Sequence, residues 1–217
     1  MRIIAFGDIH MQAGGWQRIP GIHTADLVVI TGDITNFGGR REAAAILDRL
    51  AADNPRILAV FGNLDRPEVA DLLAERDMDL HGRGRRCGAV GLIGLGGSNP
   101  TPFATPSEFS ESAIGTLLQR GFDELGGHFP FVLVSHPPPH GTATDRLNDG
   151  IHVGSTAVRA FIESRRPAVC LTGHIHESVA EDLLAGCAVI NPGMLQQGGW
   201  TELTVSGRQI NARLHQS

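Results

Sequence analysis

Short apolar runs that lead into a glycine followed by aspartate or asparagine constrain the fold of this chain most. Ile3–Phe6, Leu27–Ile30 and Ile57–Phe61 are such runs. Their length and endings are typical of buried β-strands that enter tight loops. Arg41–Ala51, between the second and third runs, has apolar residues at the spacing of an amphipathic helix. Strands and helices therefore alternate in the first part of the chain.

The rest of the chain is richer in strands. We expect helices over Glu68–Glu75, over Ser107–Gln119 with Ser107 as cap, and over Thr156–Arg165 with Ser155 as cap. Further strands are expected over Gly88–Leu95, Phe131–Ser135, Ala168–Thr172, Cys187–Ile190, Thr201–Val205 and Gln209–Leu214, the last two forming a hairpin with its turn at Ser206-Gly207. This order predicts an α/β protein with a mixed sheet, or with two packed sheets flanked by helices. Without a repeat or a linker, one domain over residues 1–217 is expected.

The composition is that of a soluble globular protein, with 41% hydrophobic and 19% charged residues. A formal net charge of −5 without a Lys/Arg-rich run disfavours an extended nucleic-acid surface. No apolar run approaches the roughly 20 residues of a membrane span, and Met1–Phe6 is too short for a signal-peptide core. Cys87, Cys170 and Cys187 form no C-x-x-C pair and suit buried reduced thiols. We therefore expect a cytoplasmic protein.

Polar motifs with metal-binding side chains follow the apolar runs, where open α/β sheets build their sites. Their carboxylates, imidazoles and amide oxygen suit Mn²⁺, Fe²⁺, Co²⁺, Ni²⁺ or Zn²⁺ better than Ca²⁺, and the absence of thiolates argues against a structural zinc site. Such a set is too large for one transition ion and suits two if one carboxylate bridges them. The glycines before Asp33, Asn63 and His174 are expected to provide sharp turns. The motifs are Asp8-Ile9-His10, Gly32-Asp33, Gly62-Asn63-Leu64-Asp65, Ser135-His136 and Gly173-His174-Ile175-His176.

In this order the motifs read D-x-H, G-D, G-N-x-D, H and G-H-x-H, which resembles the calcineurin-like metallophosphoesterase superfamily. The resemblance spans Asp8 to His176, most of the chain. Gly96–Phe103 and Asp149–Ser155 further resemble small prokaryotic Icc-like phosphoesterases and the animal metallophosphodiesterase-domain proteins.

The resemblance implies a four-layer α-β-β-α sandwich with two mixed sheets and a dinuclear metal centre at one edge. It implies Mn²⁺ as the favoured ion, with Fe, Zn, Ni or Co as alternatives. Asp33 and Asn63 are also expected to be catalytic. Carried over residue by residue, Asp8, His10 and His176 hold the first ion, Asn63, His136 and His174 hold the second, and Asp33 bridges them.

Two divalent ions about 3.5–4 Å apart can deprotonate a bridging water, and the resulting hydroxide attacks phosphorus in line with the leaving oxygen. Because Asp8 and Asp33 only partly cancel the charge of two divalent ions, the loaded site attracts phosphate despite the acidic chain. The chain is thus expected to be a metal-dependent phosphoric ester hydrolase.

One position departs from the family pattern. Many members read G-N-H-[DE], and that histidine helps to protonate the leaving group, but this chain has Leu64 there. Because leucine cannot transfer a proton, poor leaving groups such as the alkyl alcohols of phosphomonoesters should suffer most. Some small prokaryotic members also lack this histidine and resemble phosphodiesterases more than monoesterases, so the resemblance favours phosphodiester hydrolysis. His140 and His152 are the candidates to replace the missing acid, although His152 could also be an ordinary loop histidine before the Ser155 cap.

Other interpretations stay open at this stage. The main alternative is a non-catalytic or weakly catalytic nucleotide-binding or scaffold protein on the same fold, and a third is a nuclease acting on a short oligonucleotide. Asp65 and Arg66 either contact substrate or pair on the surface. The expected partner is a small phosphate ester or nucleotide, without a membrane and without an extended nucleic-acid surface, and the sequence leaves a homodimer open.

Overall fold

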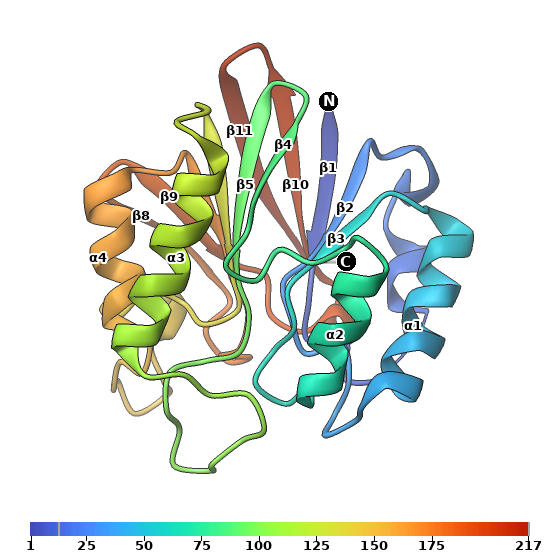
Figure 1. Ribbon diagram of the computed structural model, residues 1–217, viewed down its shortest axis with the longest axis horizontal. Helices are drawn as coiled ribbons and strands as arrows, with labels where there is room; N and C mark the ends of the chain where they lie inside the picture. The colour runs from blue at the N-terminus through green and yellow to red at the C-terminus, as the bar shows by residue number, and fades with distance from the viewer. Residues whose placement is uncertain (13, 217) are drawn as a thin grey trace.

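Two β-sheets lie face to face, and helices cover the outer face of each (Figure 1). The computed structural model describes residues 1–12 and 14–216. One sheet has the order β11 (Gln209–Gln216), β10 (Gly199–Ser206), β1 (Arg2–Phe6), β2 (Leu27–Ile30) and β3 (Ile57–Ala59). The other has the order β4 (Gly84–Cys87), β5 (Val90–Leu95), β6 (Phe131–Ser135), β7 (Val169–Leu171), β9 (Cys187–Asn191) and β8 (Ala180–Leu184).

Both sheets are mixed, with parallel centres. Strands β1, β2 and β3 run parallel, as do β5, β6, β7 and β9, whereas β10, β11, β4 and β8 add antiparallel pairings. Helices α1 (Arg40–Asp53) and α2 (Pro67–Glu75) lie on the first sheet, and α3 (Glu111–Leu125) and α4 (Thr156–Arg165) lie on the second (Figure 1).

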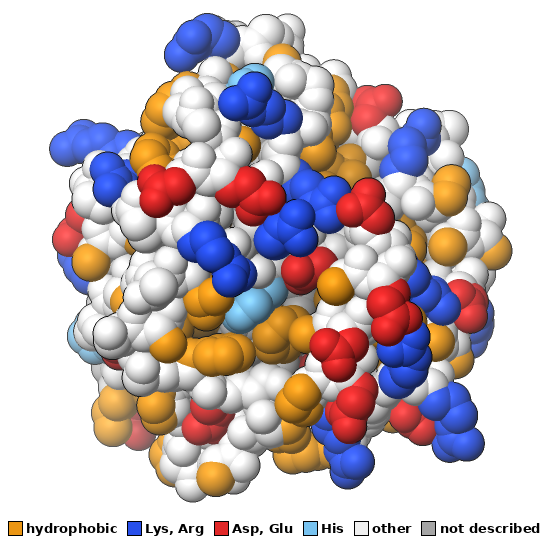
Figure 2. All heavy atoms as spheres, viewed as in Figure 1, with side chains coloured by type: hydrophobic (Ala, Val, Ile, Leu, Met, Phe, Trp, Pro, Cys, Tyr) orange, Lys and Arg blue, Asp and Glu red, His pale blue; other side chains and the backbone are white. Residues whose placement is uncertain are grey.

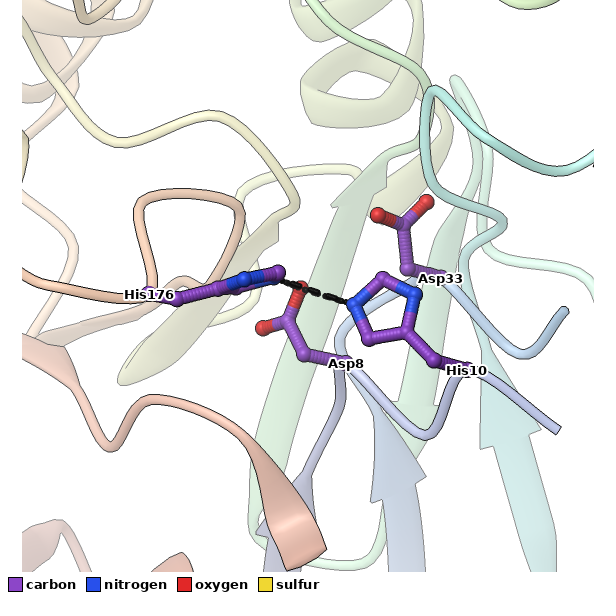
Figure 3. Close-up of side chains that lie close together, drawn as sticks. All are labelled: Asp8, His10, Asp33 and His176. Carbon is purple, nitrogen blue, oxygen red and sulfur yellow. Dashed lines mark hydrogen bonds and ion pairs between the residues drawn. The ribbon is translucent and has the colours of Figure 1, made fainter. Parts of the chain in front are cut away.

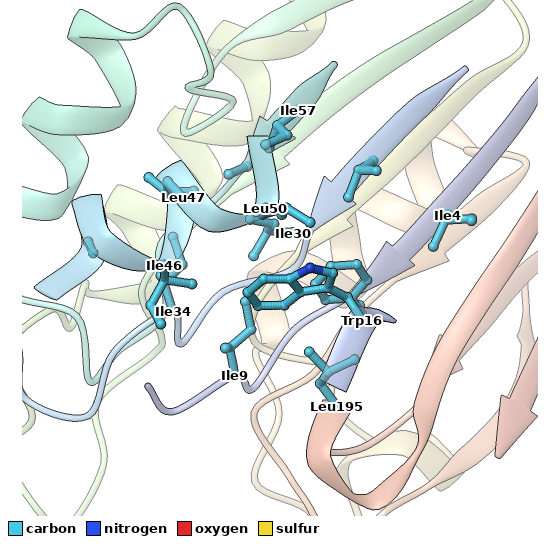
Figure 4. Packing of buried hydrophobic residues seen from close by; sticks show 14 of the residues in the cluster. Ile4, Ile9, Trp16, Ile30, Ile34, Ile46, Leu47, Leu50, Ile57 and Leu195 are labelled. Atoms are coloured by element: carbon cyan, nitrogen blue, oxygen red, sulfur yellow. The ribbon is translucent and has the colours of Figure 1, made fainter. Parts of the chain in front are cut away.

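Three apolar clusters separate the four layers. Alternate residues of each strand point to opposite faces, so that Ile4 packs under α1 while Ile3 packs between the sheets. Trp16 is fully buried in the first cluster among Ile9, Ile34 and Leu195 (Figure 4). The third cluster joins the second sheet to α3 and α4. The α-β-β-α sandwich implied by the family resemblance is therefore confirmed.

Most element boundaries follow the sequence signals, and α4 has its expected bounds because Ser155 caps it. Helix α3, by contrast, begins at Glu111, since the Ser110 hydroxyl accepts from the Ala113 N–H at 3.2 Å. The Ser107 hydroxyl instead donates to the Asp65 carbonyl at 2.6 Å, so the expected Ser107 cap was wrong.

Further details of the strands differ from expectation. The strand expected over Gly88–Leu95 begins at Val90, and β4 before it was not expected. Strand β8 was not expected, because its sequence AEDLL contains two acidic residues and one residue, Leu184, that is buried at this sheet edge. The turn of the closing hairpin lies one residue later than expected, at Gly207-Arg208. That residues 1–217 form one domain stays a prediction.

Charges are mixed on the face of the molecule shown in Figure 2, where acidic and basic side chains lie next to one another. Among the described residues, none of the helices combines the length and apolar content that crossing a membrane requires.

Candidate metal centre

The residues of the motifs meet where parallel strands from both sheets end. Asp8 and His10 follow β1, Asp33 follows β2, and Asn63 follows β3 in the next loop. From the second sheet, His136 follows β6 directly, and His174 and His176 follow β7. The carboxyl ends of the strands thus place donors from two sheets against one another.

The first subset of donors contains Asp8, His10 and His176. Their ligand atoms and a carboxylate oxygen of Asp33 all lie within 4.8 Å of one another (Figure 3). The Nε2 atoms of His10 and His176 are 3.0 Å apart, and His176 Nε2 lies 3.2 Å from Asp8 Oδ1. Imidazole and carboxylate lone pairs that converge in this way fit a divalent transition ion.

The second subset is centred on the amide oxygen of Asn63. This Oδ1 atom lies 2.8 Å from His174 Nδ1 and 3.0 Å from His136 Nε2. Asp33 Oδ2 is 3.6 Å from the same His136 nitrogen. Asp33 therefore adjoins both subsets, and the donor set fits two ions that share its carboxylate.

The two subsets and Asp33 are together called the cage. Hydrogen bonds to residues outside the cage orient the donor atoms towards its centre. The Nδ1 atom of His136 lies 2.9 Å from the Thr31 carbonyl, an arrangement that directs Nε2 towards the cage. The Leu64 N–H donates to Asp33 Oδ1 at 2.9 Å. The Asn63 Nδ2 donates to the Thr105 hydroxyl at 3.0 Å, which fixes the amide so that its oxygen faces the histidines.

We predict that Thr105→Val weakens metal binding about 10- to 100-fold, because Asn63 loses the partner that orients its oxygen. Isothermal titration of the metal-free protein with Mn²⁺ measures the effect. Thr101→Val is the matched control, since both hydroxyls donate to Glu108 at 2.6 Å but Thr105 is the one that accepts from Asn63. Equal affinities of the two variants would contradict the orienting role.

Four of the donors have a left-handed backbone. The φ angles are 48° for Asp8, 46° for His10, 46° for Asp33 and 70° for His174. Such angles are uncommon for residues other than glycine and cost on the order of 1–3 kcal/mol each. Four such residues occur together at the cage, so the surrounding fold must stabilise a strained backbone that places the donor side chains.

Glycines beside the donors serve close approach more than turning. Gly32 does have a positive φ of 114°. Gly62 and Gly173 do not, so a left-handed turn is not what requires glycine at these two positions. A Cβ atom on Gly62 would lie 2.0 Å from Asp33 Oδ1, and one on Gly173 would lie 2.4 Å from Asp8 Oδ2. Side chains at these positions would occupy the space of the donors.

Asp65 is a buried structural residue. Its carboxylate accepts hydrogen bonds from the backbone N–H groups of Ile34, Thr35 and Gly62 at 3.1, 2.7 and 2.9 Å. Burial, followed by the charge of Asp33, raises the pKa of Asp65 to about 6. Asp65 therefore ties together the loops that carry Asp33 and Asn63 and does not pair on the surface. Arg66 is exposed on the surface.

Burial and nearby charges shift the pKa values of the His136 and His174 imidazoles in opposite directions. Burial, followed by the charge of His136, lowers the pKa of His174 to about 4. Burial opposes a charge on His136 too, but Asp33 and Asp8 outweigh it and raise the pKa of His136. His136 Nε2 and Asp33 Oδ2, 3.6 Å apart, thus favour each other's charged form, and a divalent ion bound here would compete with the proton on His136.

A pocket of about 710 Å³ adjoins the cage and contains Leu64 and His152. His152 Nδ1 lies 2.7 Å from Asp145 Oδ1, and this carboxylate also accepts from the Thr142 N–H at 2.8 Å. His140 does not line the pocket, and its ring centroid lies 5.9 Å from that of His152. Of the two candidate acids, the structure therefore brings His152 to the site.

Sequence reasoning missed two residues around the site, Thr105 and Asp145. Thr105-x-x-Glu108 has the spacing of a capping box, and Asp145 likewise has that spacing from Thr142. Both patterns indicate a local turn. Neither predicts that Thr105 contacts Asn63 or that Asp145 contacts His152.

Comparisons with known proteins agree with this geometry. The calcineurin-like phosphoesterase family model matches residues 1–178, and the chain belongs to this family. Protein MJ1162 of Methanocaldococcus jannaschii is 35% identical over 202 residues, which cover 88% of each chain. The family and the converging donors together support a metal-dependent phosphoester hydrolase.

Solved structures share the metallophosphoesterase fold. TT1561 of Thermus thermophilus aligns with a TM-score of 0.72 and 17% identity, covering 98% of this chain and 97% of that one. A dimetal phosphatase from Danio rerio aligns with a TM-score of 0.62 and 13% identity, covering 100% and 96%. At these identities the likeness concerns the fold.

Proposed function

We propose that the chain is a dinuclear-metal phosphodiesterase. The observation that carries the proposal is the pair of donor subsets, Asp8-His10-His176 and Asn63-His136-His174, with Asp33 adjoining both. Asp33 and Asn63 line the adjacent pocket as well, so that a substrate there would lie against the ions. The dimetal phosphatase from Danio rerio, which shares the fold, is consistent with two ions.

When bound, two divalent ions would supply a hydroxide nucleophile from water at neutral pH and would neutralise the phosphoryl oxygens. Mn²⁺ is the ion we favour, with Fe, Zn, Ni and Co as alternatives. The chain itself contributes the geometry. Asp33 is held by the Leu64 N–H, and Asn63 by Thr105.

The preference for diesters rests on Leu64. This side chain lines the pocket directly after Asn63, where many family members have the histidine that protonates the leaving group. An alkoxide leaving from a monoester needs that proton more than an aryloxide does. The pocket therefore suits esters whose leaving group is stable as an anion.

His152 is our candidate for a substitute proton donor. Its Nδ1 faces the buried Asp145 carboxylate, so that the opposite edge of the ring is available to the pocket. A carboxylate behind an imidazole fixes the tautomer and the orientation of the ring. His140, the other candidate from the sequence, does not line the pocket.

The alternative is a non-catalytic or weakly catalytic nucleotide-binding or scaffold protein. The filled donor set argues for catalysis, and Leu64 is the feature that favours the alternative. We also propose a cytoplasmic protein, because the thiols of Cys170 and Cys187 are free and buried. A small phosphate ester or nucleotide is the proposed substrate, and light scattering in solution tests whether the chain is a homodimer.

The experiment that tests the function starts from protein stripped of metal. Mn²⁺, Ni²⁺, Zn²⁺ or Mg²⁺ is restored separately, and paired 4-nitrophenyl monoester and diester substrates are assayed. Metal-dependent diester hydrolysis that is lost in Asp33→Ala supports the proposal. Two bound ions per chain without hydrolysis of either ester would favour the nucleotide-binding alternative.

We predict that Leu64→His raises turnover of phosphomonoesters with poor leaving groups on the order of 10²-fold, the usual contribution of a placed general acid. Diesters with good leaving groups should change little, because they need no proton. The ratio of monoester to diester turnover in the purified variant measures this. An unchanged ratio would show that the missing histidine does not set the preference.

For His152→Gln we expect kcat/KM to fall about 10²-fold on diesters of phenol and to change little on diesters of 2,4-dinitrophenol. Glutamine keeps the size of the side chain but cannot donate the proton. His140→Gln is the control and should match the wild type on both substrates. A fall of the same size on both leaving groups would indicate a structural role for His152 instead.

A further inference from the structure

The pocket beside the metal cage has room for more than a phosphoryl group. Its volume of about 710 Å³ lies in the roughly 300–1,000 Å³ range of small-molecule sites. Asp33, Asn63 and His174 form the end next to the metal-ligand side chains, and the loops around Pro100–Thr105 and Leu147–Gly154 form the walls. An ester group of a bound substrate would extend between these walls.

The walls carry apolar side chains together with the imidazole of His152. Among the described residues, no lysine or arginine lines this pocket, and Asp33 of the cage is its one carboxylate. A second phosphate or a carboxylate on the substrate would find no lysine or arginine there and would lose its hydration. The apolar part of the lining consists of Phe37, Leu64, Phe103, Leu147, Val153 and Ile175, together with two prolines.

Two phenylalanines of this lining are unusually exposed. Phe103 is 82% and Phe37 52% exposed, and they come from loops on different parts of the chain. Phe37 has a left-handed backbone, with φ of 57°, and its N–H donates to the Leu64 carbonyl at 3.1 Å. The Phe103 N–H donates to the Thr101 hydroxyl at 3.2 Å. Both residues line the pocket and have a hydrogen-bonded backbone. Among the described residues, none covers most of either side chain.

We infer that this pocket selects phosphate esters with a bulky, uncharged, apolar or aromatic ester group, and that Phe37 and Phe103 determine this specificity. The inference rests on the proposed function, because the cage must hold the phosphoryl group. Covering exposed aromatic rings removes apolar surface from water, and an aromatic group gains further from stacking. Substrates with a small or a charged ester group lack both contributions.

Binding of phosphonates to the Mn²⁺-loaded protein tests the inference without catalysis. Methylphosphonate and phenylphosphonate carry the same charged group, and 4-carboxyphenylphosphonate adds a second charge to the ring. We expect phenylphosphonate to bind at least about 10-fold more tightly than either of the others, in line with the discrimination of apolar pockets. Isothermal titration gives the three dissociation constants.

Variants then test which residues cause the tighter binding of phenylphosphonate. Phe103→Ala and Phe37→Ala should each reduce the ratio of phenyl- to methylphosphonate affinity several-fold while leaving methylphosphonate binding intact. Leu183→Ala is the matched control, because this equally apolar side chain is 71% exposed on β8 and does not line the pocket. Equal binding of methyl- and phenylphosphonate, or an unchanged ratio in both Phe variants, would overturn the inference alone. Failure of every phosphonate to bind the loaded cage would instead overturn the proposed function beneath it.

Discussion

Asp33→Asn should reduce kcat/KM for a phosphodiester by on the order of 10³-fold or more and should leave fewer than two ions bound per chain. Asp33 adjoins both donor subsets, with His136 Nε2 at 3.6 Å, so that two bound ions would share its charge. A neutral amide cannot hold two divalent ions as a carboxylate would, and bound metal ions stabilise the transition state by several kcal/mol. Each loss of about 1.36 kcal/mol of this stabilisation corresponds to a tenfold fall in rate.

Asparagine can keep the hydrogen bond that Asp33 Oδ1 accepts from the Leu64 N–H, so the fold should survive. Circular dichroism and thermal unfolding of the metal-free protein check this. Asp48→Asn is the control, because Asp48 forms an exposed ion pair with Arg76 and such pairs contribute little. A variant at position 33 that keeps two ions and more than a tenth of the activity would contradict the bridging role.

Gly62→Ala should disrupt the cage although it changes no donor. The new Cβ atom would lie 2.0 Å from Asp33 Oδ1 and 2.3 Å from the Asp33 backbone nitrogen, far inside contact distance. Either Asp33 or the loop that carries Asn63 must move. Overpacking of this kind lowers the free energy of unfolding by roughly 1–3 kcal/mol, and we expect activity to fall by at least about 10²-fold, as for other misplaced site groups.

The control for this change is Gly115→Ala. Gly115 lies within α3, and a Cβ atom there would have nothing within 4 Å. Because alanine is a better helix former, this variant should be more stable by about 0.5–1 kcal/mol and fully active. Chemical denaturation and Mn²⁺ titration of both variants separate stability from ion binding. If Gly62→Ala behaves like Gly115→Ala, the close packing of Gly62 on Asp33 is not required.

The fold was largely predictable from local signals. Buried strands such as Leu27–Ile30 are short and uniformly apolar, and Ser155 marks the start of α4. Local signals failed where a distant partner decides the structure. Ser107 and Ser110 are both good caps in sequence, but Ser107 is bound to the Asp65 carbonyl.

The candidate site likewise has a part that the sequence predicts and a part that it does not. Its donors were predictable as positions because Asp, Asn and His directly follow strand-like runs, and the structure brings them together; their roles as ligands stay a proposal. The supporting residues were not predictable. Thr105 is 42 residues from Asn63 in sequence, and only the fold places its hydroxyl against the amide. The exposure of Phe37 and Phe103 likewise depends on how two separate loops meet.

The central claim is that two ions share Asp33. A crystal structure of the Mn²⁺-loaded protein, with anomalous diffraction measured at the manganese absorption edge, tests it most directly. We predict two anomalous peaks, one among Asp8, His10 and His176 and one among Asn63, His136 and His174, with the Asp33 carboxylate between them. A single peak, or two peaks that Asp33 does not join, would contradict the account.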